Sequence, residues 1–170
     1  MMGQNQSPKY EIFTFLTDGK VHNSDIIVPT TNMSILVEVQ PRLDLSYSTL
    51  IWFDTDITNN TNRYLQVAFY VSYAYFDFGK VRNVVSLPTY DPTVVNRFAL
   101  SSYDNGLCIK YINNTKFTTN NLVFGGLTEI GNLRGNVNKD NHQQRVTAYL
   151  YKNALTDEQL QAYITDGTIP

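Results

Sequence analysis

The chain has 170 residues, of which 42% are hydrophobic, 13% aromatic and only 16% charged, and its formal net charge is −2. This length predicts one domain with a sizeable core, and the near-neutral charge argues against nucleic acid as the main partner. Since no apolar run approaches the roughly 20 residues of a spanning helix, membrane insertion is not expected.

Residues 1–9 carry no strand or helix signal and are predicted to form a flexible N-terminal arm. They also lack the basic start and apolar run of a signal peptide, so we expect synthesis in a reducing cytoplasm. The remaining residues, 10–170, are predicted to fold as one β-sandwich domain.

Short strand-like runs follow one another along the chain, separated by turn and loop signals. The predicted strands are Tyr10–Leu16, Met33–Gln40, Ser48–Thr55, Arg63–Phe78 (two strands or one bent strand), Val81–Leu87, Asn96–Tyr103, Leu107–Ile112, Thr115–Thr119, Asn121–Leu127 and Gln144–Tyr151. Asp104–Gly106 and Asn113–Asn114 predict tight turns, because Gly and Asn accept positive φ. The Gly- and Asn-rich segment 129–143 is predicted to be a loop. No helix separates these strands, which favours an antiparallel sandwich or jelly roll over a parallel sheet.

A short helix is predicted after the last strand, in "TDEQLQAYITDG". Thr156 is a suitable N-cap, and Gln159 three residues later completes a capping box. Gly167 supplies the C-terminal stop. Because Leu160 and Ile164 make only one side apolar, the helix must lie on a sheet or over an end of the sandwich.

The second half of the chain contains, in order, "NRFAL", the "SYDNG" hairpin, the "YINN" turn, "LVFGG" and the closing "VTAYLYKNALTDEQLQAYI". In these residues it resembles the laminin-G-like, concanavalin A-like jelly-roll superfamily, in its phage-type version. The resemblance covers about Asn96–Pro170, although "NRFAL" lacks the Trp that is frequent in the corresponding strand of the family. It implies an antiparallel β-sandwich whose short C-terminal helix plugs an open end of the two sheets.

The residues that could support catalysis are sparse, and enzyme activity is not expected. A glycoside hydrolase of this superfamily would carry alternating carboxylates on one strand, and no predicted strand has them. Cys108 is expected to be a buried hydrophobe, since His22 and His142, both expected in solvated loops, are not beside it. Asp54 and Asp56, on one face of a strand end, are candidate Ca²⁺ ligands or an acid/base pair, or else a solvated loop edge. No other cofactor is expected.

Aromatic residues are concentrated on both faces of Arg63–Phe78. One face must be core. The other, with Tyr70 or with Tyr73 and Tyr75, could form a platform on which sugar rings stack, joined by Trp52. Alternatively, these rings fill a second layer of the core or a subunit interface.

Two functions are predicted. In the first, the chain is a non-catalytic structural protein of a virion, such as a phage head fibre, decoration or tail-associated protein. It would be made in the host cytoplasm, assemble with other virion proteins or with itself, for example as a trimer, and adhere to a host glycan. In the second, it is a carbohydrate-binding module of a bacterial surface or secreted protein. An oligomer that depends on residues 1–9 would favour the first, and glycan binding by the isolated chain would favour the second.

Overall fold

The computed structural model describes residues 10–16, 21–28, 32–40, 47–54, 63–70, 73–78, 81–86, 95–120, 127–131 and 145–170. The described strands are β1 (Tyr10–Leu16), β2 (Val21–Val28), β3 (Met33–Gln40), β4 (Tyr47–Asp54), β5 (Arg63–Tyr70), β6 (Tyr73–Phe78), β7 (Val81–Ser86), β8 (Asn96–Ser102), β9 (Cys108–Ile112), β10 (Thr115–Thr119), β11 (Leu127–Gly131) and β12 (Arg145–Tyr151). The described helix is α1 (Asp157–Asp166). The predicted N-terminal arm, residues 1–9, lies outside the described residues.

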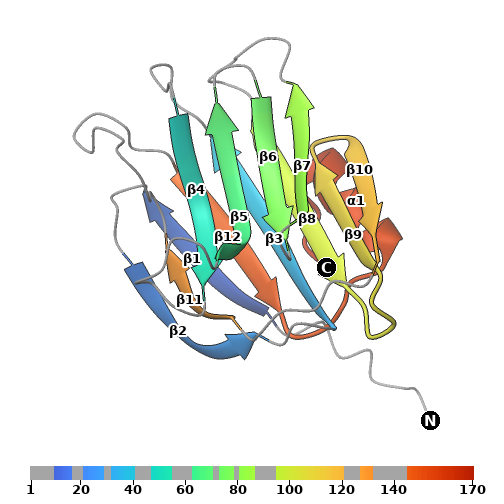
Figure 1. Cartoon of the computed structure of the whole chain (residues 1–170), viewed down its shortest axis with the longest axis horizontal. Helices are drawn as coiled ribbons and strands as arrows, with labels where there is room; N and C mark the ends of the chain where they lie inside the picture. Colours follow the sequence, from blue (N-terminus) through green and yellow to red (C-terminus); the bar gives the residue numbers. More distant parts are fainter. Residues whose placement is uncertain are drawn as a thin grey trace.

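The described strands form two antiparallel sheets that pack face to face (Figure 1). The back sheet has the order β1-β12-β3-β8-β9-β10, and the front sheet has the order β2-β11-β4-β5-β6-β7. Each described strand pair is antiparallel. The predicted all-β sandwich with a short C-terminal helix is therefore confirmed.

The main core lies between the two sheets and follows from the two-residue period of the strands. On β3, Met33, Ile35 and Val37 point inward and are fully buried. Phe76 of the front sheet meets Phe98 of the back sheet edge to face, with 6.0 Å between ring centres. This contact joins the sheets near β6 and identifies Phe76 as an inward-facing residue.

Helix α1 lies on the outer face of the back sheet, behind β9 and β10 in Figure 1, and does not plug an end of the sandwich. The expectation from the family resemblance is wrong on this point. The physical reason is that the outward residues of β3, β8 and β9 include the apolar side chains of Leu36, Ala99, Ile109 and Tyr111, which need a cover. The buried cluster that results contains Leu36, Ala99, Ile109, Tyr111, Tyr151, Leu155, Leu160, Tyr163 and Ile164.

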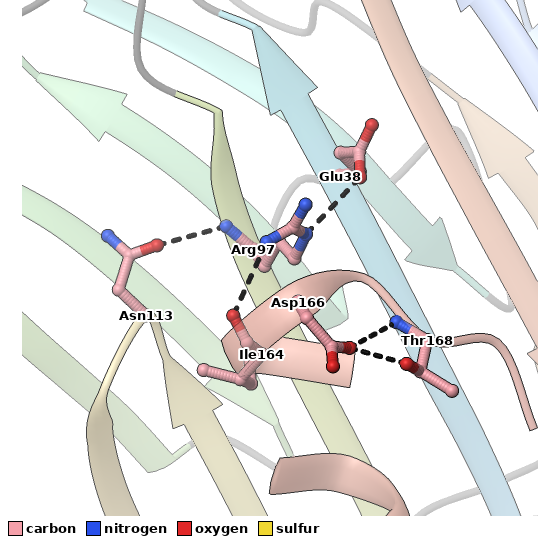
Figure 2. A network of polar contacts seen from close by, with 6 residues as sticks. All are labelled: Glu38, Arg97, Asn113, Ile164, Asp166 and Thr168. Carbon is pink, nitrogen blue, oxygen red and sulfur yellow. Dashed lines mark hydrogen bonds and ion pairs between the residues drawn. The ribbon is translucent and has the colours of Figure 1, made fainter. Parts of the chain in front are cut away.

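The predicted ends of α1 are confirmed. The Gln159 backbone N–H donates to Thr156 Oγ1 at 3.2 Å, and the Thr156 N–H donates to Gln159 Oε1 at 2.9 Å. Gly167 ends the helix with a φ of 80°. The Arg97 guanidinium sits against this end, donating to Ile164 O at 3.4 Å and to Glu38 Oε2 at 3.3 Å (Figure 2). The cation therefore meets both a carboxylate and the negative end of the helix dipole.

The turns follow their sequence signals, with a φ of 84° at Gly106 and 47° at Asn113. Asn113 also ties two strands together, because its Oδ1 accepts from the Arg97 N–H at 2.9 Å (Figure 2). Its own backbone N–H donates to Arg97 O at 2.8 Å. Arg63–Phe78 forms two strands, β5 and β6.

Two strands differ from the prediction. Strand β2 was not expected, because "VHNSDIIV" is polar in its first half and does not alternate; His22 therefore lies in a strand and not in a loop. Strand β11 extends into the segment predicted as a loop, with a register shift between Leu127 and Glu129 against β2. The predicted strand Asn121–Leu127 lies outside the described residues except for Leu127.

Candidate functional site

The outward side of strands β6 and β7 gathers polar, aromatic and exposed groups. The cross-strand pairs are Tyr73 with Ser86, Tyr75 with Val84 and Asp77 with Arg82. Because Phe76 faces the core, the residues that alternate with it on β6 face outward. On β7 exposure alternates in the same way, and its outward residues are exposed. We call these six residues, Tyr73, Tyr75, Asp77, Arg82, Val84 and Ser86, the β6–β7 face.

An ion pair lies at the hairpin end of the β6–β7 face. Arg82 donates from Nε to Asp77 Oδ1 and from Nη2 to Asp77 Oδ2, both at 2.8 Å. The guanidinium carbon lies 4.0 Å from the centre of the Tyr75 ring. The two parallel hydrogen bonds and the ring together hold the guanidinium plane in one orientation. The Arg82 side chain nevertheless remains 56% exposed, so a ligand can reach it.

Apolar surface lies beside this cation. Val84 is 50% exposed, and Tyr73 is half-buried. In Figure 1 no described strand or helix lies in front of β6 and β7. The face thus offers hydrogen-bond donors next to C–H and ring surface, the combination that saccharides meet in binding sites.

The structure brings two of the predicted platform residues, Tyr73 and Tyr75, to one side of β6. Tyr75 is only 3% exposed and lies under the Arg82 guanidinium, so a ligand above it would meet Arg82 first. Tyr70 ends β5, and Trp52 lies in β4 opposite Gln66. The side chains of Trp52 and Tyr70 lie outside what the structure describes, and their part in the platform stays a prediction.

The predicted metal ligands are also only partly described. Asp54 ends β4, with Glu129 and Arg63 as its backbone partners on either side. Asp56 and His142 lie outside the described residues. Within the described part of the chain, no three His, Cys, Asp or Glu side chains lie close enough to hold a metal ion.

Cys108 lies in the sandwich interior and is fully buried. Desolvation raises the pKa of its thiol to about 12, although the nearby Lys110 amine opposes the shift. The thiol thus stays protonated at neutral pH, which fits the expected buried hydrophobe.

Sequence reasoning missed Arg82, which stands in "DFGKVRN". Phe78 and Val81 pair on either side of Gly79 and Lys80, which places Asp77 opposite Arg82. Gly79 is a turn signal, and a two-residue hairpin connection at this point sets the register of the two strands. The ion pair could therefore have been predicted from the sequence.

No family model matches this chain, and no curated protein matches its sequence. Solved structures match its fold. The leech intramolecular trans-sialidase complexed with 2,7-anhydro-Neu5Ac has a TM-score of 0.63 and 14% identity, over 95% of this chain and 28% of its own. Trypanosoma rangeli sialidase in complex with sialic acid has a TM-score of 0.61 and 12% identity, over 89% of this chain and 27% of its own. The CBM40 of Ruminococcus gnavus IT-sialidase bound to alpha2,3 sialyllactose has a TM-score of 0.56 and 14% identity, over 79% of this chain and 83% of its own.

These matches show a shared β-sandwich fold. The chain spans about a quarter of the length of the two sialidases but most of the isolated CBM40. No helix among the described residues is long and apolar enough to cross a bilayer.

Proposed function

We propose that the chain is a non-catalytic carbohydrate-binding module that binds saccharide on the β6–β7 face. The observation that carries the proposal is the oriented guanidinium of Arg82, stacked on Tyr75 and exposed on the outer face of the front sheet. The likeness to a CBM40 bound to alpha2,3 sialyllactose supports it, because that module is about the size of this sandwich. One fold can serve many functions, so the proposal depends on the residues of the β6–β7 face and not on the fold.

A saccharide fits the chemistry of the β6–β7 face. Arg82 supplies N–H donors for sugar oxygens, while Val84 and Tyr73 supply surface for sugar C–H groups. Because Asp77 offsets the charge of Arg82, a hydroxyl-rich ligand does not need to carry a charge of its own. A carboxylated sugar would compete with Asp77 for the same guanidinium.

The binding is proposed to be non-catalytic because Asp77 is the only acidic side chain among the six residues of the face. Cleavage of a glycosidic bond ordinarily uses two carboxyl groups flanking the bond. Both carboxylate oxygens of Asp77 are also engaged by hydrogen bonds from Arg82.

An extracellular or cell-surface location accompanies this proposal. The virion role and the homo-oligomer stay predictions from the sequence, since no contact among the described residues favours them over a free module. Sizing the purified chain with and without residues 1–9 would test them.

A glycan array probed with the intact chain tests the proposal, followed by calorimetric titration of the best glycan. We expect Arg82→Ala to weaken that binding at least ten-fold and Tyr73→Ala to weaken it less. Lys152→Ala is the matched control, because Lys152 is exposed after β12 in the back sheet. Circular dichroism checks that each variant is folded. The absence of any bound glycan, or equal binding by Arg82→Ala and wild type, would overturn the proposal.

A further inference from the structure

A groove of about 320 Å³ lies between α1 and the β9–β10 hairpin. It is on the outer side of the back sheet, whereas the β6–β7 face is on the outer side of the front sheet. The lining residues are Tyr111, Asn114, Gln161, Ile164 and Thr165. Its volume is near the lower end for small-molecule pockets, which leaves room for one ring-sized ligand.

A hydrogen-bond network around Asp157 holds the groove in shape. Asp157 Oδ1 accepts from Tyr111 Oη at 2.6 Å, and its Oδ2 accepts from Lys116 Nζ at 2.6 Å and from Gln161 Nε2 at 3.0 Å. These bonds join the first turn of α1 to both strands of the hairpin. Since Gln161 donates its N–H to Asp157, its amide is oriented, and its carbonyl oxygen remains as an acceptor.

The groove carries little net charge. Lys116 and Asp157 are paired at its edge and neutralise each other. The remaining polar groups of the lining are the amides of Asn114 and Gln161 and the hydroxyl of Thr165. Such groups both donate and accept, which suits neighbouring hydroxyl groups better than it suits an ion.

The lining also includes a little carbon surface. Tyr111 is 5% exposed and Ile164 is 7% exposed, so each contributes only a small area of ring or aliphatic surface. A mainly polar lining of this kind would match an uncharged ligand whose hydroxyl groups make most of the contacts.

We propose that this groove is a second binding site, and that it takes one uncharged sugar ring of the hexose class. The proposal stands on the groove and does not depend on the β6–β7 face. If both sites bind, ligands would approach the sandwich from opposite faces. A branched or surface-attached glycan that reaches both sites would then be bound more tightly than by either site alone.

Titration of the intact ¹⁵N-labelled chain with glucose, galactose, mannose and N-acetylglucosamine, each to millimolar concentration, tests the groove. We expect at least one sugar to shift the side-chain amide signals of Asn114 and Gln161 and the backbone signal of Thr165, in a saturable way. Thr165→Trp should fill the groove and abolish these shifts. Glu158→Ala, on an exposed position of the same helix, should keep them.

A second variant keeps the test valid if Thr165→Trp does not fold. Asn114→Ala combined with Gln161→Ala changes two side chains of the lining and should weaken binding at least ten-fold, as followed by the backbone signal of Thr165. If none of the four sugars moves these signals, or if the shifts survive groove filling, the second site is refuted. The same spectra report β6–β7 amides separately, so failure of the groove and failure of the β6–β7 face are distinguishable.

Discussion

The two outer faces of the sandwich differ in what covers them. On the back sheet, the outward residues of β3, β8 and β9 include Leu36, Ala99 and Ile109, and α1 buries them. On the front sheet, the outward residues of β7 are Arg82, Val84 and Ser86, and they stay exposed. An apolar outward row requires a cover, whereas a mixed outward row can remain as a surface for a ligand.

Two cations on opposite sides of strands β6 and β7 differ in a similar way. Outside, Arg82 is exposed and paired with the Asp77 carboxylate. Inside, Lys110 is fully buried, and its Nζ donates to the backbone carbonyls of Phe76 at 3.4 Å and Val81 at 3.3 Å. Long bonds to neutral carbonyls offset only part of the cost of burying an ammonium group. The inner cation is therefore a source of instability, and the outer one is close to neutral for stability.

The largest effect is expected at the covered face. Leu160→Ala removes a fully buried side chain from beneath α1 and should lower the free energy of unfolding by about 2–5 kcal/mol. Urea denaturation would measure the loss. Glu158→Ala, on an exposed position of the helix, should change stability by no more than about 0.5 kcal/mol. Equal effects of the two changes would show that α1 does not cover the back sheet.

The buried amine should respond in the opposite direction. Desolvation lowers the pKa of Lys110 to about 8, although Cys108 and Asp77 oppose this shift. Replacing the charge with an apolar chain of similar length, Lys110→Met, should stabilise the fold at pH 7 by about 1–3 kcal/mol. Urea denaturation of both proteins measures this difference, and a loss of stability in Lys110→Met would contradict the buried cation.

The same residue predicts a pH dependence. Because the pKa of Lys110 is lower in the folded protein, the unfolded chain binds more protons between about pH 8 and pH 10.5, and stability rises with pH there. The raised pKa of Cys108 acts in the reverse sense above about pH 9. From pH 7.5 to 9 the wild type should gain about 1 kcal/mol, and Lys110→Met should lose this gain. Urea denaturation at the two pH values measures this gain. If the free energy of unfolding rose equally in both proteins, a group other than Lys110 would cause the pH dependence.

The helix cap should have an intermediate effect. Thr156→Ala removes the side-chain acceptor for the Gln159 N–H and should cost about 1 kcal/mol. Thr156→Ser keeps the hydroxyl and should cost much less. Thermal unfolding of both variants separates loss of the cap from a general effect of the position.

The smallest effect on stability is expected at the uncovered face. A double-mutant cycle of Asp77→Ala and Arg82→Ala should give a coupling energy of about 0.2–1 kcal/mol, because Arg82 is largely exposed and water screens the pair. Saccharide binding should fall far more than stability does. A coupling of several kcal/mol would instead indicate a structural role for the pair.

Local signals predicted most of the fold. Strand-like runs bounded by turn and loop signals predicted β3 and β12, Gly106 and Asn113 predicted their turns, and the capping box predicted the start of α1. The position of α1 was not predictable, because it depends on which outward residues of three separate strands become neighbours.

The candidate site was predicted in part, for a similar reason. Alternation placed Tyr73 and Tyr75 on one face, but it did not reveal that Arg82 covers Tyr75. That contact depends on the register between β6 and β7. The contribution of Trp52 and Tyr70 to a sugar-binding platform remains a prediction.

Non-catalytic saccharide binding is tested by saturation-transfer NMR on the intact chain mixed with sialyllactose and with the best glycan from the array. We expect transfer from protein to sugar-ring protons of at least one glycan, reduced in Arg82→Ala, with each oligosaccharide intact after prolonged incubation. If no glycan received transfer, or if an oligosaccharide were cleaved, the chain would not be a non-catalytic carbohydrate-binding module.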